Sequence, residues 1–390
     1  MSVSFAKRSA LALAATVALS SAVVVIPAAP SLAAPASVSH ATVARTAPVS
    51  TVKTKWTWAN GSALTAKNVT PTALSASSYY LRVEHNQGDT VELLGVLPNG
   101  HGIGLDYDSK VREYTKTGPK YLAKGGGPAL ASVMVRGGNV YGSTYSGDLY
   151  RFTGASNKPI KLGKIDGLLG INVAVTASRI YWTRTVSVGG GKDRYEVVSR
   201  ALSGGAIKVE AKDARDPQAT DAGVLVVRTA GAFAEEDWSA AGSTTGIGVL
   251  SNGGVKTLLK YNGKGLYSQI GDGAWTFTAS GHTLTLPVAG TSGQVVINLN
   301  NRKAWRVSTP KGTVPGWAGV GGSRAAWDVR STGGDVKRNA IYLFNVDSGR
   351  ASVLSTKANG YSYPQVNGKA IGWTYNRPGG LIEYKSIVLK

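Results

Sequence analysis

The feature that most constrains the fold is a short apolar segment that follows a turn and recurs along the chain. The copies are HGIGLD (101–106), NVYGST (139–144), RIYWTR (179–184), GVLVVR (223–228), GAWTFT (273–278), RAAWDV (324–329) and KAIGWT (369–374). Their starts are 38, 40, 44, 50, 51 and 45 residues apart. Each is preceded by an apolar segment and followed by a hairpin partner, and a further short strand closes most units. Four strands repeated at this interval predict a β-propeller of four-stranded antiparallel blades.

The two ends of the repeated region predict how the ring closes. The last unit has a third strand, LIEYKSIVLK (381–390), and no fourth strand after it, whereas SSYYLRVEH (77–85) precedes the first unit and belongs to none. An unpaired apolar edge strand is an aggregation hazard, so we expect 77–85 to pair with 381–389. Residues 76–390 would give 45 residues to each of seven blades. A six-bladed ring is the alternative, because the first unit matches the repeat least well.

The N-terminal residues predict export from the cell. Lys7 and Arg8 precede an uncharged apolar run over 10–26, and small residues follow near 31–36. This pattern is typical of a secretory signal peptide, which we place at 1–36. Residues 37–75 are rich in Ala, Thr, Ser and Pro, a composition that predicts an arm or linker. We expect Trp56 and Trp58 to attach this arm to the propeller, which we place at 76–390.

Charge and cysteine content limit the classes of partner and site. The chain has 43 Lys and Arg against 22 Asp and Glu, a formal net charge of +21, and it has no cysteine. The charge favours polyanions such as wall polymers and is compatible with a membrane surface, although no retained transmembrane helix is predicted. The absence of cysteine excludes thiolate metal sites and thiol nucleophiles. No nucleic-acid-binding module is present, and we expect a monomer.

Three local sequences carry a resemblance to known propellers. They are Tyr181-Trp182-Thr183, the hairpin VYGSTYSGDLYR and the turn FNVDSG (344–349). These resemble secreted propellers of the TolB-like, NHL and YWTD kinds, with Arg184 where the YWTD motif has Asp. The resemblance implies the architecture, and no family's active site comes with it.

Catalytic and metal-binding patterns are scarce in the sequence. The four histidines show no metal-ligand spacing, and no nucleophile or calcium-loop motif occurs in a fitting context. Glu235 to Trp238 form the one acidic cluster, which we interpret as a solvated loop tip. We therefore predict no catalytic residue, no metal and no cofactor.

The predicted binding face consists of the loops that join the second and third strands of each unit. These loops are long at 184–195, 228–245 and 330–338, and long insertions on one side of a rigid scaffold often build binding sites. The residues predicted to bind there are cations and one aromatic: Arg184, Lys192, Arg194, Trp238, Arg330, Lys337, Arg338 and Arg377. Such a set suits a polyanion or a sugar.

Three functions remain open at this point. The first is a secreted, non-enzymatic binding or scaffolding propeller at the cell envelope, whose partner is a protein or an anionic wall polymer. The second is a secreted lyase or hydrolase that acts at the propeller axis on a polysaccharide or small molecule. The third is a subunit support in an envelope complex. Acids or histidines that converge on the axis would favour the enzyme.

Overall fold

A computed structural model describes residues 50–85, 92–153, 158–165, 173–234, 244–263, 277–287, 293–334, 339–355, 362–376 and 382–390. The signal peptide predicted at 1–36 and the cluster at 235–238 lie outside these residues. The described chain is all-β, with two single-turn 3₁₀ helices, η1 (Ala76–Ser78) and η2 (Lys124–Gly126). Within these ranges no helix has the length and apolar character needed to cross a membrane.

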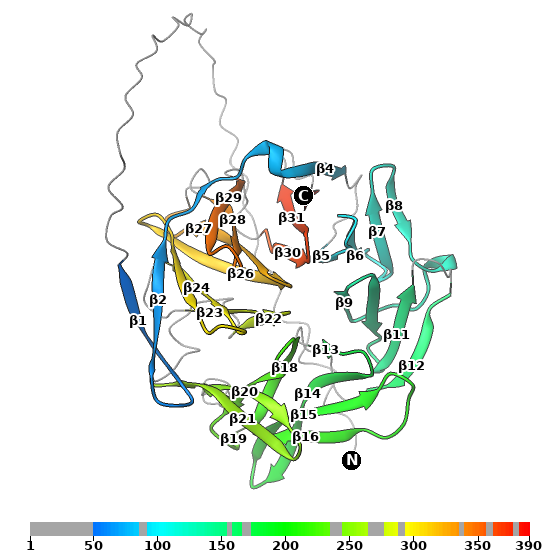
Figure 1. Cartoon of the computed structure of the whole chain (residues 1–390). Helices are drawn as coiled ribbons and strands as arrows, with labels where there is room; N and C mark the ends of the chain where they lie inside the picture. The colour runs from blue at the N-terminus through cyan, green and yellow to red at the C-terminus, as the bar shows by residue number, and fades with distance from the viewer. Residues whose placement is uncertain are drawn as a thin grey trace, which may run out of the picture. The chain divides into compact units, whose positions relative to one another are not determined.

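Consecutive strands pair into small antiparallel sheets, as the repeat predicts (Figure 1). Sheet β5–β8 contains β5 (Glu92–Val96), β6 (Gly102–Leu105), β7 (Val111–Thr115) and β8 (Gly118–Tyr121). Sheet β9–β12 contains β9 (Ser132–Arg136), β10 (Asn139–Ser143), β11 (Asp148–Thr153) and β12 (Ile160–Lys164). Sheet β13–β16 contains β13 (Ala174–Val175), β14 (Arg179–Gly189), β15 (Lys192–Ala201) and β16 (Lys208–Lys212), and β19 (Phe233–Ala234) pairs with β15.

A ten-stranded sheet joins two such groups through an N-terminal hairpin. The first group is β17 (Ala214–Thr220), β18 (Gly223–Thr229), β20 (Thr244–Ser251) and β21 (Gly254–Tyr261). The second group is β22 (Thr278–Ser280), β23 (Thr283–Pro287), β24 (Gly293–Asn298) and β25 (Ala304–Ser308). The hairpin of β1 (Thr51–Trp58) and β2 (Ala63–Val69) lies between them, with β1 antiparallel to β21 and β2 parallel to β25.

The last two sheets also take a strand from the N-terminal segment. Sheet β26–β29 contains β26 (Thr313–Gly321), β27 (Arg324–Ser331), β28 (Ala340–Asn345) and β29 (Arg350–Ser355), with β3 (Thr72–Ala73) parallel to β29. Sheet β30–β32 contains β30 (Gln365–Asn367), β31 (Ala370–Asn376) and β32 (Ile382–Leu389), with β4 (Tyr79–His85) antiparallel to β32. The pairing of β4 with β32 is the one that the sequence predicts.

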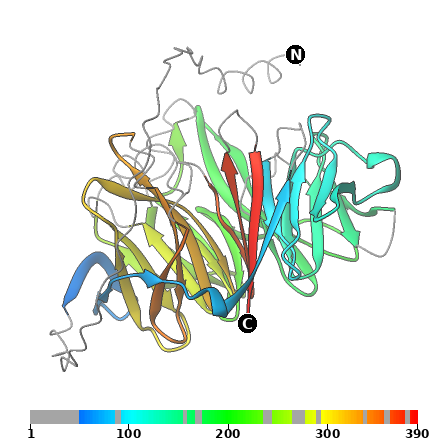
Figure 2. The ribbon, with the colours of Figure 1, turned by 90° about the horizontal axis from the view of Figure 1, so that it is seen from above.

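The N-terminal segment is more ordered than the arm predicted over 37–75. Residues 51–69 form the β1–β2 hairpin, and Trp56 and Trp58 are buried in a core cluster with Leu64 and Ala66. The strand alternates, so Lys53 and Lys55 are exposed while the two tryptophans point inward. The sequence prediction missed this alternation because the composition is that of a linker. Figures 1 and 2 show the segment in blue along the outside of the sheets, where it covers strand edges.

The fifth predicted unit is wrong by one strand. The repeat predicts GAWTFT (273–278) as the second strand of its unit, but Thr278 begins β22, the first strand of its group. The second strand is β23, within HTLTLP. Phe277 and Thr278 line a central cavity, as an innermost strand does. The apolar residues of GAWTFT predict a strand that is covered on both faces. Buried Phe277, directly before the innermost strand β22, produces the same apolar pattern.

Apolar side chains fill the spaces between neighbouring sheets. Phe152 and Val140 pack with Ile103 and Val111 between sheets β9–β12 and β5–β8. Glycines let the innermost strands approach one another: a Cβ at Gly319 on β26 would collide with the carbonyl oxygen of Pro364 next to β30. Innermost strands of neighbouring sheets therefore contact one another from β13 through β17, β22, β26, β30 and β5 to β9.

Candidate functional site

The innermost strands enclose a cavity of about 460 Å³. Its walls come mainly from β5, β9, β22, β26 and β30, with Val173 before β13 and Gln218 on β17. Several lining side chains, among them Met134 and Gln365, are only partly buried, so solvent reaches the cavity. This size is within the range of small-ligand pockets.

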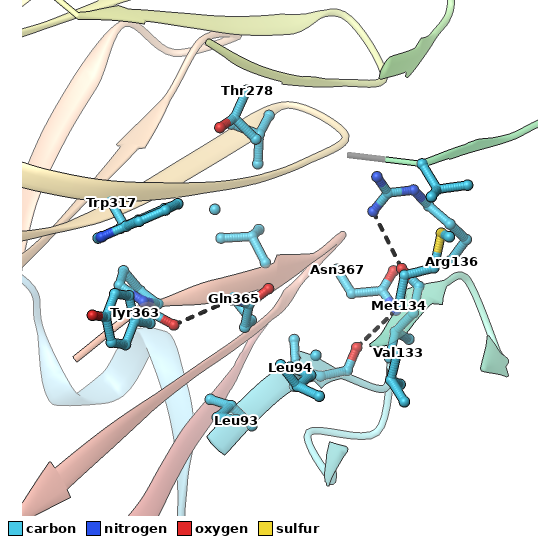
Figure 3. A pocket seen from close by; sticks show the side chains of 18 of the residues that line it. Leu93, Leu94, Val133, Met134, Arg136, Thr278, Trp317, Tyr363, Gln365 and Asn367 are labelled. Atoms are coloured by element: carbon cyan, nitrogen blue, oxygen red, sulfur yellow. Dashed lines mark hydrogen bonds between the residues drawn. The ribbon is translucent and has the colours of Figure 1, made fainter. Parts of the chain in front are cut away.

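One side of the cavity is aromatic. Trp317 and Tyr363 line it, and their rings meet edge to face with centroids 5.6 Å apart (Figure 3). Tyr363 has a φ of 40°, in the left-handed region that a bulky residue rarely adopts. Strained backbone of this kind persists only where the surrounding structure enforces it, and it is concentrated at ligand sites.

A buried carboxylate lies behind Trp317. Strand β26 has a bulge between Pro315 and Ala318, opposite Asp328 on β27. A Cβ at Gly316 would collide with the Asp328 carboxylate, so glycine allows the bulge to close over it. Burial raises the pKa of Asp328 to about 6, although Arg330 and the backbone N–H groups of Trp317 and Ser362 act to lower it. Asp328 is fully buried and does not line the cavity, which gives it a role in positioning Trp317.

The other side of the cavity carries a positive charge. Arg136, the last residue of β9, lies there beside Met134, across from Trp317 (Figure 3). Its Nη1 donates to the carbonyl oxygen of Val135 at 3.2 Å, and its Nε is buried without a hydrogen-bond partner among the described residues. Burial lowers the pKa of Arg136.

An asparagine fixes the wall next to this arginine. The Asn367 amide donates to the carbonyl oxygens of Val96 at 3.0 Å and Gly137 at 2.7 Å. It thereby connects the ends of β30 and β5 with the turn that follows Arg136. The end of the cavity is held together by these bonds, so the guanidinium sits on a fixed frame.

The lining combines apolar and aromatic side chains with one cation and five neutral polar side chains: Ser132, Gln218, Thr278, Gln365 and Asn367. Among the described residues that line the cavity there is no Asp, Glu or His. No group of three or more such residues in the described ranges is arranged to hold a metal ion. The cavity as described offers surface for an apolar body and one guanidinium for an anion.

Two of the arginines predicted to bind on the loop face form ion pairs with a glutamate. Arg184 donates to Glu196 through Nε at 3.1 Å and Nη2 at 2.9 Å, and Arg194 donates to the other oxygen at 3.1 Å. Burial would raise the pKa of Glu196, but these hydrogen bonds and charges outweigh it and hold the pKa below its usual value. Residues 184–195, predicted as a loop, instead extend β14 to Gly189 and begin β15 at Lys192.

The remaining predicted residues are divided between the surface and undescribed segments. Lys192 is exposed where β15 begins. Arg330 lies 3.6 Å from Asp328 and is largely buried. Trp238, Lys337, Arg338 and Arg377 lie outside the described residues, so the predicted face as a whole stays a prediction.

The sequence prediction missed the cavity residues. Arg136, Trp317 and Tyr363 come from three different sheets and share no motif. The available signal was positional: Arg136 and Trp317 precede the recurring segments at 139 and 324, where the first strand of each unit belongs. In a propeller the first strands face the axis.

Comparisons with known proteins give structural matches only. No family model matches the chain, and no curated protein matches it in sequence. An oligogalacturonate lyase from Vibrio parahaemolyticus matches with a TM-score of 0.49 and 10% identity, over 87% of this chain and 98% of that one. An oligogalacturonate lyase in complex with manganese gives 0.48 and 11%, over 82% and 98%. A catalytically inactive virginiamycin B lyase from Staphylococcus aureus with quinupristin gives 0.45 and 10%, over 80% and 100%. Each match extends over most of both chains at low sequence identity.

Proposed function

We propose that this chain is an exported, non-enzymatic propeller that binds a small molecule in its central cavity. The observation that carries the proposal is the lining: apolar and aromatic side chains, several neutral polar groups and one guanidinium, with no carboxylate or imidazole among the described lining residues. Small-molecule sites are mostly apolar with a few placed polar groups. The lyase or hydrolase alternative would require a general acid or base at the axis.

We propose that the strands around the cavity form a seven-bladed ring. The ten-stranded sheet would then consist of two four-stranded blades whose outer edges are joined by the β1–β2 hairpin. Support comes from the core clusters of the described residues. Each cluster packs between neighbouring groups of strands, including one that joins Leu93 and Tyr114 of sheet β5–β8 to Ala370 and Tyr384 of sheet β30–β32.

The loop face remains a second place where a polyanion or a protein could bind. Its support is the net charge and exposed Lys192. Two of its arginines share the single negative charge of Glu196, which reduces the positive charge available to a polymer. The cavity therefore has the stronger support.

A thermal-shift screen of small apolar molecules tests the proposal. Ligands that bind the folded state should raise the melting temperature. Gln365→Trp would fill the cavity and abolish these shifts, while Lys369→Trp, an exposed position in the same sheet, would keep them. Equal shifts in both variants, or shifts caused only by polyanions such as polyphosphate, would contradict a cavity site.

A further inference from the structure

We propose that the ligand of the central cavity carries a carboxylate that pairs with Arg136 and an apolar or aromatic body that packs on Trp317 and Tyr363. This inference rests on the proposed function and adds the chemical class of the ligand. It follows from three features of the cavity: an arginine without a carboxylate partner, a fixed polar end and an aromatic wall opposite.

The first feature is the state of Arg136. Among the partly buried arginines of the described chain, Arg112 has Asp106 beside it and Arg184 has Glu196. Arg200 and Arg228 instead donate to neutral oxygens, a backbone carbonyl and a threonine hydroxyl. Arg136 is the arginine that lines the cavity. No acid among the described residues forms an ion pair with Arg136, and burial alone accounts for its lowered pKa. A partly buried cation without a counter-ion loses part of its hydration, so an anion that enters the cavity gains a charge-assisted interaction where water screens it less than at the surface.

The second feature is geometry that suits one carboxylate. The Nη1 of Arg136 donates to the carbonyl oxygen of Val135, and Nε is enclosed by the protein. A carboxylate in the cavity would therefore meet the outer Nη end of the guanidinium, which donates charge-assisted hydrogen bonds to carboxylate oxygens. The Asn367 bonds to Val96 and Gly137 hold this end of the cavity in place, which reduces the entropy that binding costs.

The third feature is the opposite wall. Trp317 and Tyr363 lie across from Arg136, with Gln365 and Asn367 between the two sides (Figure 3). Apolar side chains such as Leu94 and Val133 also line the cavity. Aromatic walls favour planar or apolar bodies. A volume of about 460 Å³ accommodates a molecule with a few rings, which selects a small carboxylic acid over a polymer.

Titration calorimetry with a matched pair of probes tests the inference. The probes are naphthalene-2-carboxylate and naphthalene-2-carboxamide, which differ in charge and little in shape. We expect the purified protein to bind the carboxylate at least about tenfold more tightly. Arg136→Met should remove this preference and leave the affinity for the carboxamide within about twofold. Arg151→Met is the matched control: Arg151 lies on β11 of the same sheet, is partly buried, and does not line the cavity.

The outcomes separate the inference from the proposed function. Equal affinity of the unaltered protein for both probes would overturn the carboxylate inference and leave the cavity as a binding site. A preference that survives Arg136→Met would also overturn it, because the charge would then be recognised elsewhere. Binding of neither probe would overturn both.

Discussion

The β14–β15 hairpin and the central cavity present their arginines in opposite ways. On the hairpin, Arg184 and Arg194 each retain about a quarter of their side-chain surface, yet both pair with the buried Glu196. In the cavity, Arg136 is partly buried and has no carboxylate partner among the described residues. The partner of a cation, more than its exposure, therefore decides whether its charge is available to a ligand.

We expect the largest effect on the free energy of unfolding, where substitutions in the hairpin and in the cavity should differ. Glu196→Ala would leave two partly buried arginines without their acid, and we expect it to lower the free energy of unfolding by about 3 to 4 kcal/mol. Arg136→Met removes a cation that has no acid to lose, so we expect a change within about 1 kcal/mol. Urea unfolding of both variants measures the contrast, and similar losses in the two would remove the distinction.

The buried acids Glu196 and Asp328 differ in the direction of their pKa shifts: the pKa is lowered for Glu196 and raised for Asp328. The dependence of stability on pH tests this difference. Asp328 has a pKa raised to about 6, against 3.8 for the ordinary group, because burial outweighs the charge of Arg330. The folded state therefore binds the proton more tightly than the unfolded state. The resulting stabilisation is fully present below about pH 4 and is lost as the pH rises through about 6, a change of up to about 3 kcal/mol.

Asp328→Asn should remove this component from the pH dependence of the unfolding free energy. The difference between the unaltered protein and the variant, measured by urea unfolding from about pH 4 to pH 7, isolates it from the other titrating groups. A constant difference across this range would show that Asp328 does not titrate as described.

A smaller effect concerns the aromatic wall. Trp317→Ala should weaken the binding of naphthalene-2-carboxylate about tenfold by removing the ring contact, while preserving the preference over the carboxamide. Trp317→Phe should recover most of the affinity. Calorimetry gives both values, and loss of the preference in Trp317→Ala would mean that the two sides of the cavity do not act separately.

The smallest effect is expected at the hairpin. Lys192→Ser changes an exposed side chain, so we expect less than about 0.5 kcal/mol in stability and no change in probe affinity. A loss of probe affinity greater than about threefold would move the site toward the loop face.

Much of the fold was predictable because period and edge pairing are local signals. The pairing of 77–85 with 381–389 followed from an apolar strand that needed a partner, and the structure has it. The hairpin at 51–69 was missed because alternation in TVKTKWTW is short and lies within a linker-like composition.

The site was harder to predict because it depends on tertiary placement. Strand β30 has three residues, too few to show a period, and the bulge that places Trp317 depends on Asp328 in the next strand. The pairing of Arg184 with Glu196 could have been predicted from the sequence: once the turn lies between Gly189 and Lys192, the register places Arg184 directly opposite Glu196.

The central claim is that the ligand site is the cavity with Arg136 rather than the loop face. A crystal structure of the purified protein with naphthalene-2-carboxylate tests it most directly. We expect the carboxylate within hydrogen-bond distance of the Arg136 guanidinium and the rings against Trp317 and Tyr363. Density for the probe beside Lys192, or within the cavity with its carboxylate turned away from Arg136, would show that Arg136 is not the anion site.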